Sequence, residues 1–208
     1  ITPLSKEIPD NISINLSGAA SELERTWISM KNNAIIAFIV IFLLLTVLMK
    51  SLILPFVIVI TVPIAGAGGV MGLVILNQFS TQSMDMLTML GFIILTGIVV
   101  NNSILMVEQT LWHIRYESLK ISEAITEATR NRIRPIFMST LTSLFGLIPL
   151  VIFPGSGSEL YRGIGTVVFG GLSTSAILTL LMVPPLLALA LKFEKVKPIS
   201  QIKQEEFV

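Results

Sequence analysis

The chain has 208 residues, of which 53% are hydrophobic and 13% are charged, and its mean hydropathy is +0.85. Soluble domains carry roughly 25% charged residues, so this composition excludes an ordinary soluble domain and predicts a membrane protein. Cysteine is absent, which excludes a disulfide framework and a thiolate metal site. The formal net charge of +1 gives no reason to expect nucleic acid as a partner.

Residues 1–30 precede the first long apolar stretch. An alternating segment at 12–16 predicts a strand, and residues 21–27 predict a helix that leads into the membrane. One strand cannot bury a core, so its sheet must come from other polypeptide. The sequence also begins at Ile1, without an initiator methionine or a signal peptide. We therefore expect a longer protein in which residues 1–30 end a region outside the membrane.

Five uncharged stretches can each hold the ~20 apolar residues that a spanning helix needs. Lys50 alone separates the first two, which predicts a tight helical hairpin. The predicted transmembrane domain covers residues 31–192, with spans at about 33–50, 53–76, 86–108, 136–154 and 163–191. The predicted fold class is an all-α membrane protein.

The Lys and Arg residues are unevenly divided between the two sides that these spans define. If the first segment lies outside, the inner side collects ten of them: Lys50, Arg115, Lys120, Arg130, Arg132, Arg134, Lys192, Lys195, Lys197 and Lys203. The outer side keeps four: Lys6, Arg25, Lys31 and Arg162. Flanks rich in Lys and Arg stay in the cytoplasm, so we expect the N-terminus outside and the tail, residues 193–208, inside.

Small residues recur in the second, third and last spans. Gly68 and Gly72 have the spacing at which two helices pack closely in lipid. We expect the same packing role for Gly97, Gly170 and Gly171. The alternative for the second span is a hinge or a substrate path.

Residues 111–134 predict an amphipathic helix along the inner membrane face, with Ser122 as its N-cap and Pro135 starting the next span. Its three arginines suit a positive-inside anchor. The alternative is that Arg132 contributes to a polar pathway with Ser139 and Thr140.

Two adjacent amides, Asn101 and Asn102, lie inside the third apolar stretch. Polar side chains at this depth are costly, which indicates a functional contact with another helix. An amide does not titrate in the physiological range, so it can orient a titrating group but cannot carry a proton. Asp85 lies at the outer end and Glu108 at the inner boundary, where it suits an interfacial cap better than a relay. A proton-coupled machine would therefore need carboxylates from elsewhere.

The single histidine, His113, has no candidate ligands nearby and suits an interfacial position beside Trp112. The sequence shows no metal-ligand cluster, no nucleophile paired with a base and no phosphate loop. It therefore predicts no enzyme activity and no metal site.

Several linked motifs resemble the resistance-nodulation-division (RND) transporters. They are GIVVNNSILMVE at 97–108, EAITEA at 123–128, RNRIRPIFMST at 130–140, GLIPL at 146–150, GSGSE at 155–159 and GGLSTS at 170–175. Their order and spacing match the last five of that family's twelve membrane helices. Residues 1–30 are similar to the end of its second periplasmic porter region, so the resemblance covers nearly the whole chain.

This resemblance implies a proton-driven exporter of the hydrophobe/amphiphile efflux, AcrB-like branch, which carries out substrate:proton antiport and supports multidrug resistance. It implies a bacterial inner-membrane location, with the N-terminus periplasmic and the C-terminus cytoplasmic. It also implies a missing N-terminal half, a homotrimer, a periplasmic adaptor and an outer-membrane channel. No cofactor is implied, because the energy comes from the proton-motive force.

In the family, two aspartates on the fourth helix take up protons and interact with the tenth, which corresponds here to residues 87–107. Many drug pumps have a lysine at the position of Asn101, so this chain departs from the usual lysine–aspartate switch. Asn102 matches the family asparagine, Ser139 falls where a relay threonine is common, and Arg132 matches an arginine near the cytoplasmic end.

Two alternatives remain beside export of hydrophobic compounds. One is a related member that handles lipids or assists protein translocation. The other is a non-transporting structural subunit or pseudo-transporter, in which the intramembrane amides serve only helix association.

Overall fold

The computed structural model describes residues 19–194 except 154, 156 and 158. Helices in this part of the chain are α1 (Ala19–Met49), α2 (Ile53–Val59), α3 (Thr61–Asn77), α4 (Met86–Tyr116), α5 (Ile121–Ile152) and α6 (Glu159–Phe193). The predicted strand at 12–16 and most of the tail lie outside the described residues, and no strand occurs within them. Taking α2 and α3 together, five helical segments among these residues are long and apolar enough to cross a membrane. The predicted fold class and the five spans are confirmed.

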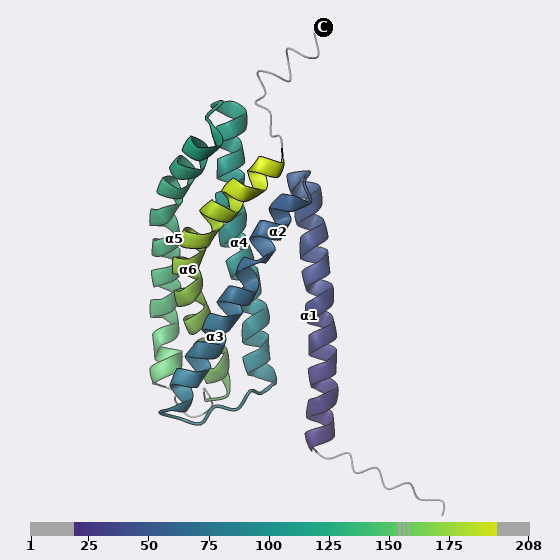
Figure 1. Cartoon of the computed structure of the whole chain (residues 1–208). Coiled ribbons are helices and arrows are strands. Elements are labelled where there is room, and N and C mark those ends of the chain that lie inside the picture. The colour runs from purple at the N-terminus through teal and green to yellow at the C-terminus, as the bar shows by residue number, and fades with distance from the viewer. Residues whose placement is uncertain (1–18, 154, 156, 158, 195–208) are drawn as a thin grey trace, which may run out of the picture.

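Helix α6 lies at the centre of the bundle, where it packs against α3, α4 and α5 (Figure 1). Helix α1 stands to one side (Figure 1), and its main contacts among the described helices are with α2 and α4. The start of α1 and the end of α6 lie at opposite ends of the bundle. The helices thus alternate in direction, as successive membrane crossings require.

Two apolar clusters stack along the bundle axis. The cluster near the α4–α5 turn is centred on side chains such as Ile58, Val107 and Leu187, which are fully buried. The other cluster joins α3, α4 and α6 through residues such as Leu95, Val99 and Val167. The outward faces of α1 and α5 are apolar and exposed, which suits contact with lipid or with further helices.

Glycines allow α3 and α6 to approach at backbone distance, in what we call the glycine seam, formed by Gly68, Gly72 and Gly170. A Cβ built on Gly170 would lie 2.6 Å from the Gly68 carbonyl oxygen and 2.9 Å from Gly72 Cα. Gly171 faces α4 instead, where an added Cβ would collide with Leu95. At Gly72 and Gly170 the neighbouring atoms belong to the backbone, so a larger residue there would force α3 and α6 apart.

Gly97 differs from the other four glycines. A Cβ built there meets no atom of the described chain within 4 Å, so the expected packing contact is not found. The reason is its place on the exposed face of α4, four residues before the exposed Asn101.

The second span is not one straight helix, because α2 ends at Val59 and α3 begins at Thr61. Pro63 has no N–H to donate to the Val59 carbonyl, which accounts for the break. On the other side, Lys50 takes a left-handed conformation (φ 51°) and makes the predicted tight turn between α1 and α2.

The prediction of a separate amphipathic helix at 111–134 is wrong. Helix α4 runs on to Tyr116, and α5 begins at Ile121 and continues through Pro135 to Ile152. The chain reverses at residues 117–120, where Ser118 has a φ of 55°. Lys120, rather than Ser122, is the N-cap of α5. A proline breaks one hydrogen bond of a helix but need not end it, so Pro135 was a misleading signal.

Candidate functional site

Helix α4 has two faces of different character. The face toward α3 and α6 buries residues such as Thr88, Leu95, Val99 and Ser103. A second stripe, at helical spacing, is exposed and carries Leu90, Ile94, Gly97, Asn101, Glu108 and Trp112. We call this stripe the open face of α4. It combines lipid-like side chains with one amide near the middle of the helix.

The two asparagines point to different sides of α4. Asn101 is exposed on the open face, whereas Asn102 is partly buried toward the bundle. Neither side chain makes a hydrogen bond within the described chain. An amide without partners in the apolar part of a bilayer is costly, so the open face is suited to a polar partner.

Three residues of α5 were predicted to belong to a polar pathway. Arg132 is partly buried, and its Nε atom is buried without a hydrogen-bond partner in the described structure. Thr140 is 6% exposed. Ser139 is exposed, and its hydroxyl donates to the Ile136 carbonyl at 3.1 Å. Arg132 and Ser139 lie seven residues apart, which places them on one side of α5.

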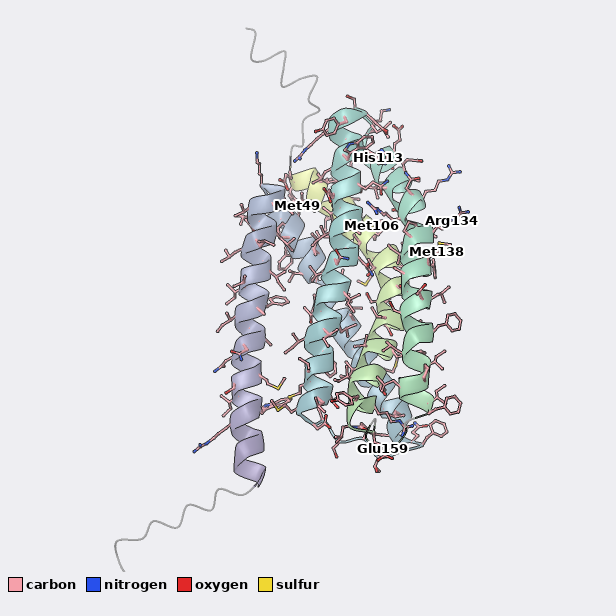
Figure 2. All side chains as sticks on the ribbon, turned by 180° about the vertical axis from the view of Figure 1, so that it is seen from behind. Met49, Met106, His113, Arg134, Met138 and Glu159 are labelled. Carbon is pink, nitrogen blue, oxygen red and sulfur yellow. The ribbon has the colours of Figure 1, made fainter. Side chains whose placement is uncertain are left out.

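No hydrogen bond joins the asparagines of α4 to Arg132, Ser139 or Thr140 in this part of the protein. The predicted residues thus lie on neighbouring helices but form no continuous chain of polar contacts. Arg134, by contrast, projects outward from α5 (Figure 2), as a positive-inside anchor would.

A polar contact that the sequence did not single out lies between α3 and α4. The hydroxyls of Thr61 and Ser103 are 3.1 Å apart, and both side chains are buried. Thr61 Oγ1 also donates to the Ile58 carbonyl at 2.6 Å, so Ser103 supplies the hydrogen between the two hydroxyls. Isolated serines and threonines are frequent in apolar helices, so no local pattern distinguishes this pair.

His113 is more buried than an interfacial residue, with 5% of its surface exposed. Its Nδ1 lies 2.7 Å from a Glu117 carboxylate oxygen, and its Nε2 is buried without a partner in the described chain. Trp112 beside it is exposed, and its ring meets the imidazole edge-to-face at 5.2 Å. Figure 2 places His113 at the end of α4 far from Glu159, and no metal-binding group of three His, Cys, Asp or Glu residues occurs among the residues described.

Arg162, near the start of α6, connects three segments at the opposite end of the bundle. Its Nε donates to the Val151 carbonyl at 2.9 Å, and its Nη1 donates to Ser80 Oγ at 2.8 Å. From the sequence, Arg162 is predictable only as one of four outer cations, because Ser80 lies 82 residues away in the chain and Val151 lies across the loop between α5 and α6.

The sequence profile of the AcrB/AcrD/AcrF family matches residues 2–190, which is most of the chain. The chain belongs to this family. Its resemblance to the RND transporters is therefore confirmed, and AcrB/AcrD/AcrF membership together with the five spans identifies a multi-pass membrane protein of a transporter family.

Several relatives of this chain are considerably longer than the chain itself. The swarming motility protein SwrC of Bacillus subtilis (strain 168) is 32% identical over 191 residues, covering 91% of this chain and 18% of SwrC. The multidrug resistance protein MdtC of Escherichia coli is 35% identical over 177 residues, covering 85% of this chain and 17% of MdtC. A crystal structure of a heavy metal efflux pump superposes with a TM-score of 0.75 and 29% identity, covering 90% of this chain and 18% of the pump. The chain thus spans less than a fifth of these proteins.

Proposed function

We propose that this chain supplies five membrane helices of a proton-driven RND exporter that expels hydrophobic compounds by substrate:proton antiport. Family membership and the similarity to MdtC, which is named as a multidrug resistance protein, support this function. The observation that carries the mechanism is Asn101, an amide on the open face of α4 with no partner in the described chain.

The open face of α4 meets a helix from the other half of the transporter, and that helix carries the proton-binding carboxylates. An amide can donate a hydrogen bond to a carboxylate and accept one from a carboxylic acid. Asn101, on the open face, therefore donates to a facing carboxylate when that group is ionised and accepts from it when it is protonated. Asn102, partly buried on the neighbouring side of α4, belongs to the same proposed coupling site. Because Asn101 adds no positive charge, the ionised form gains less stabilisation here than beside a lysine.

Helix α5 contributes the cytoplasmic part of the same polar path. Arg132 has a buried Nε without a partner in the described structure, so it is available to an acceptor from the other half. Ser139 and Thr140 lie farther along α5 and offer hydroxyls at intermediate depth.

The test replaces Asn101 and Asn102 with leucine in the native protein. We expect N101L/N102L to abolish coupled export of a hydrophobic dye while the protein still assembles in the membrane. The matched control is N32L/N33L, the same pair of changes at exposed positions of α1. Export that survives N101L/N102L would reject the proposed role. A protein that never exports, whichever asparagines it carries, would indicate the non-transporting structural subunit instead.

The proposed location is the bacterial inner membrane, with the N-terminus in the periplasm and the C-terminus in the cytoplasm. The ten-to-four division of Lys and Arg supports this orientation. Because the sequence has no cysteine, a single cysteine introduced into this chain is the only thiol in it that a maleimide can label. We expect a membrane-impermeant maleimide to label T81C, in the α3–α4 loop, from outside intact spheroplasts. K120C, in the α4–α5 turn, should be labelled only after lysis, and the reverse result would invert the topology.

As an RND exporter of this branch, the complete protein works as a homotrimer with a periplasmic adaptor and an outer-membrane channel. It needs no bound cofactor, because the proton-motive force drives the cycle. Crosslinking of the native protein in its membrane should yield a trimer and an adaptor adduct, and recovery of the protein only as a monomer would contradict this assembly.

A further inference from the structure

A groove of about 320 Å³ runs between α3 and α6 on the outside of the bundle. The backbone of the glycine seam forms its floor, because Gly68, Gly72 and Gly170 all line it. Its walls include Met71, Ile75, Phe79, Val151, Phe169 and Ser173. The small residues that bring the two helices together thus leave an elongated hollow at the surface.

The walls of the groove offer no free hydrogen-bond donor, although three hydroxyl residues line it. Thr166 donates to the Arg162 carbonyl at 2.8 Å, Ser173 to the Phe169 carbonyl at 2.8 Å and Thr174 to the Gly170 carbonyl at 2.9 Å. Each hydroxyl is therefore satisfied within its own helix. The groove is suited to an apolar occupant that forms no hydrogen bonds.

Arg162 marks one end of this groove. Its contact Val151 lines the groove, its other contact Ser80 follows the lining residue Phe79, and Thr166 lies one turn further along α6. The two hydrogen bonds fix the guanidinium at this position and use two of its five N–H groups. The remaining N–H groups are available to an anion.

The charge of Arg162 is not neutralised by a neighbour in the described structure. No carboxylate oxygen of the described residues lies within 4 Å of the Arg162 guanidinium, because the one ion pair among these residues joins His113 and Glu117. Glu159, one turn earlier, is exposed, and the Asp85 carboxylate accepts from the Thr88 N–H and hydroxyl at the start of α4. Arginine binds phosphate oxygens with several N–H groups at once.

We propose that a phospholipid occupies this site, with one acyl chain in the groove between α3 and α6 and its phosphate on Arg162. The groove, which offers no free hydrogen-bond donor, matches the acyl chain of the phospholipid. Arg162, fixed by two hydrogen bonds at one end of the groove, matches its phosphate. The lipid fills the hollow beside the glycine seam and ties α3, α5 and α6 together. This site is independent of the proposed coupling at Asn101.

The first experiment uses the native polypeptide in nanodiscs that contain phosphatidylglycerol with a photoactivatable group on its acyl chain. We expect crosslinks to peptides of α3 and α6 that contain Ile75, Phe79 or Phe169. This measurement needs no substitution, so it tests the proposal even if variants fold poorly. Crosslinks confined to other helices, or protection of the groove by a helix from elsewhere in the protein, would overturn it.

The second experiment measures retention of phosphatidylglycerol by native mass spectrometry for two variants. R162Q should lower lipid affinity about tenfold, because charge-assisted hydrogen bonds are lost. S173F should fill the groove and exclude the acyl chain. The controls are R130Q, which removes an exposed cation from α5, and S143F, which adds the same volume on the exposed side of α5.

Loss of lipid in R162Q and S173F but not in their controls would support the proposal. Unchanged binding in S173F would leave only an anion site at Arg162, and the proposal would fail. Displacement of the lipid by millimolar inorganic phosphate would identify free phosphate as the ligand and would also overturn it. Export measured on the same variants separates this result from the proposed function, which depends on Asn101 and Asn102.

Discussion

On the side of α4 that faces the bundle, Leu95 meets Gly171 and Ser103 bonds to Thr61. On the open face, a Cβ at Gly97 would meet nothing within 4 Å, and Asn101 makes no hydrogen bond within the described structure. Both sides carry small and polar residues within an apolar helix. On the side that faces the bundle, these residues are packed and hydrogen-bonded to neighbouring helices of the described structure. On the open face they have no such partner there, which indicates that the same residue types are reserved for a contact made by other polypeptide.

The largest effect on stability should come from closing off the glycine seam. Gly170→Ala places a Cβ against the backbone of Gly68 and Gly72, and we expect it to lower the free energy of unfolding by about 3 kcal/mol. The measurement is SDS-induced unfolding of the purified native protein. Gly66→Ala is the matched control, because a Cβ at Gly66 meets nothing within 4 Å. Equal stability of the two variants would mean that α3 and α6 are not in backbone contact.

A smaller loss should follow from breaking the hydroxyl pair between α3 and α4. Thr61→Val keeps the side-chain shape but leaves Ser103 without its partner, so we expect a loss of about 1 kcal/mol in the same unfolding experiment. Thr142→Val is the control, since Thr142 is exposed and its hydroxyl bonds only to the Met138 carbonyl of its own helix. If both variants lost the same stability, the interhelical bond would contribute nothing.

The smallest effect is expected at Gly97. Gly97→Ala adds a methyl group where the described chain has open space, and alanine is the better helix former by up to about 1 kcal/mol. We therefore expect unchanged or slightly increased stability in SDS titration. A loss as large as that of Gly170→Ala would show that the open face is closed by direct backbone contact in the native protein, and the contrast between the two sides of α4 would disappear.

The number of spans could be predicted because each needs a long apolar stretch, and the charges of this chain are concentrated between them. Helix ends outside the membrane were less predictable. Pro135 looked like a helix start, yet α5 passes through it, while the actual reversal depends on Ser118 and Lys120, which carry no strong turn signal. Ser118 is exposed and left-handed, and the Leu119 N–H bonds back to the His113 carbonyl at 3.4 Å; local sequence does not predict this conformation, because glycine or asparagine is the usual residue at such a position.

Contacts between distant helices were the second limit. The sequence predicted packing roles for Gly68, Gly72 and Gly170, but it did not predict that Gly170 packs against the other two. For Gly97 the packing role stays a prediction, because a Cβ there meets nothing within 4 Å in the described chain and a small residue allows close approach without specifying which helix comes close. The depth of Asn101 and Asn102 was readable from the sequence, but their orientation toward different sides required the structure.

The uninterrupted length of α4 has a mechanical consequence. Its 31 residues measure about 46 Å at ~1.5 Å per residue, whereas the hydrocarbon core of a bilayer is about 30 Å thick. A helix that leaves the membrane without a break acts as a stiff rod, and only the four residues 117–120 separate α4 from α5. If α4 shifts along its axis or rotates at the level of Asn101, the turn at residues 117–120 therefore moves with it and displaces the start of α5.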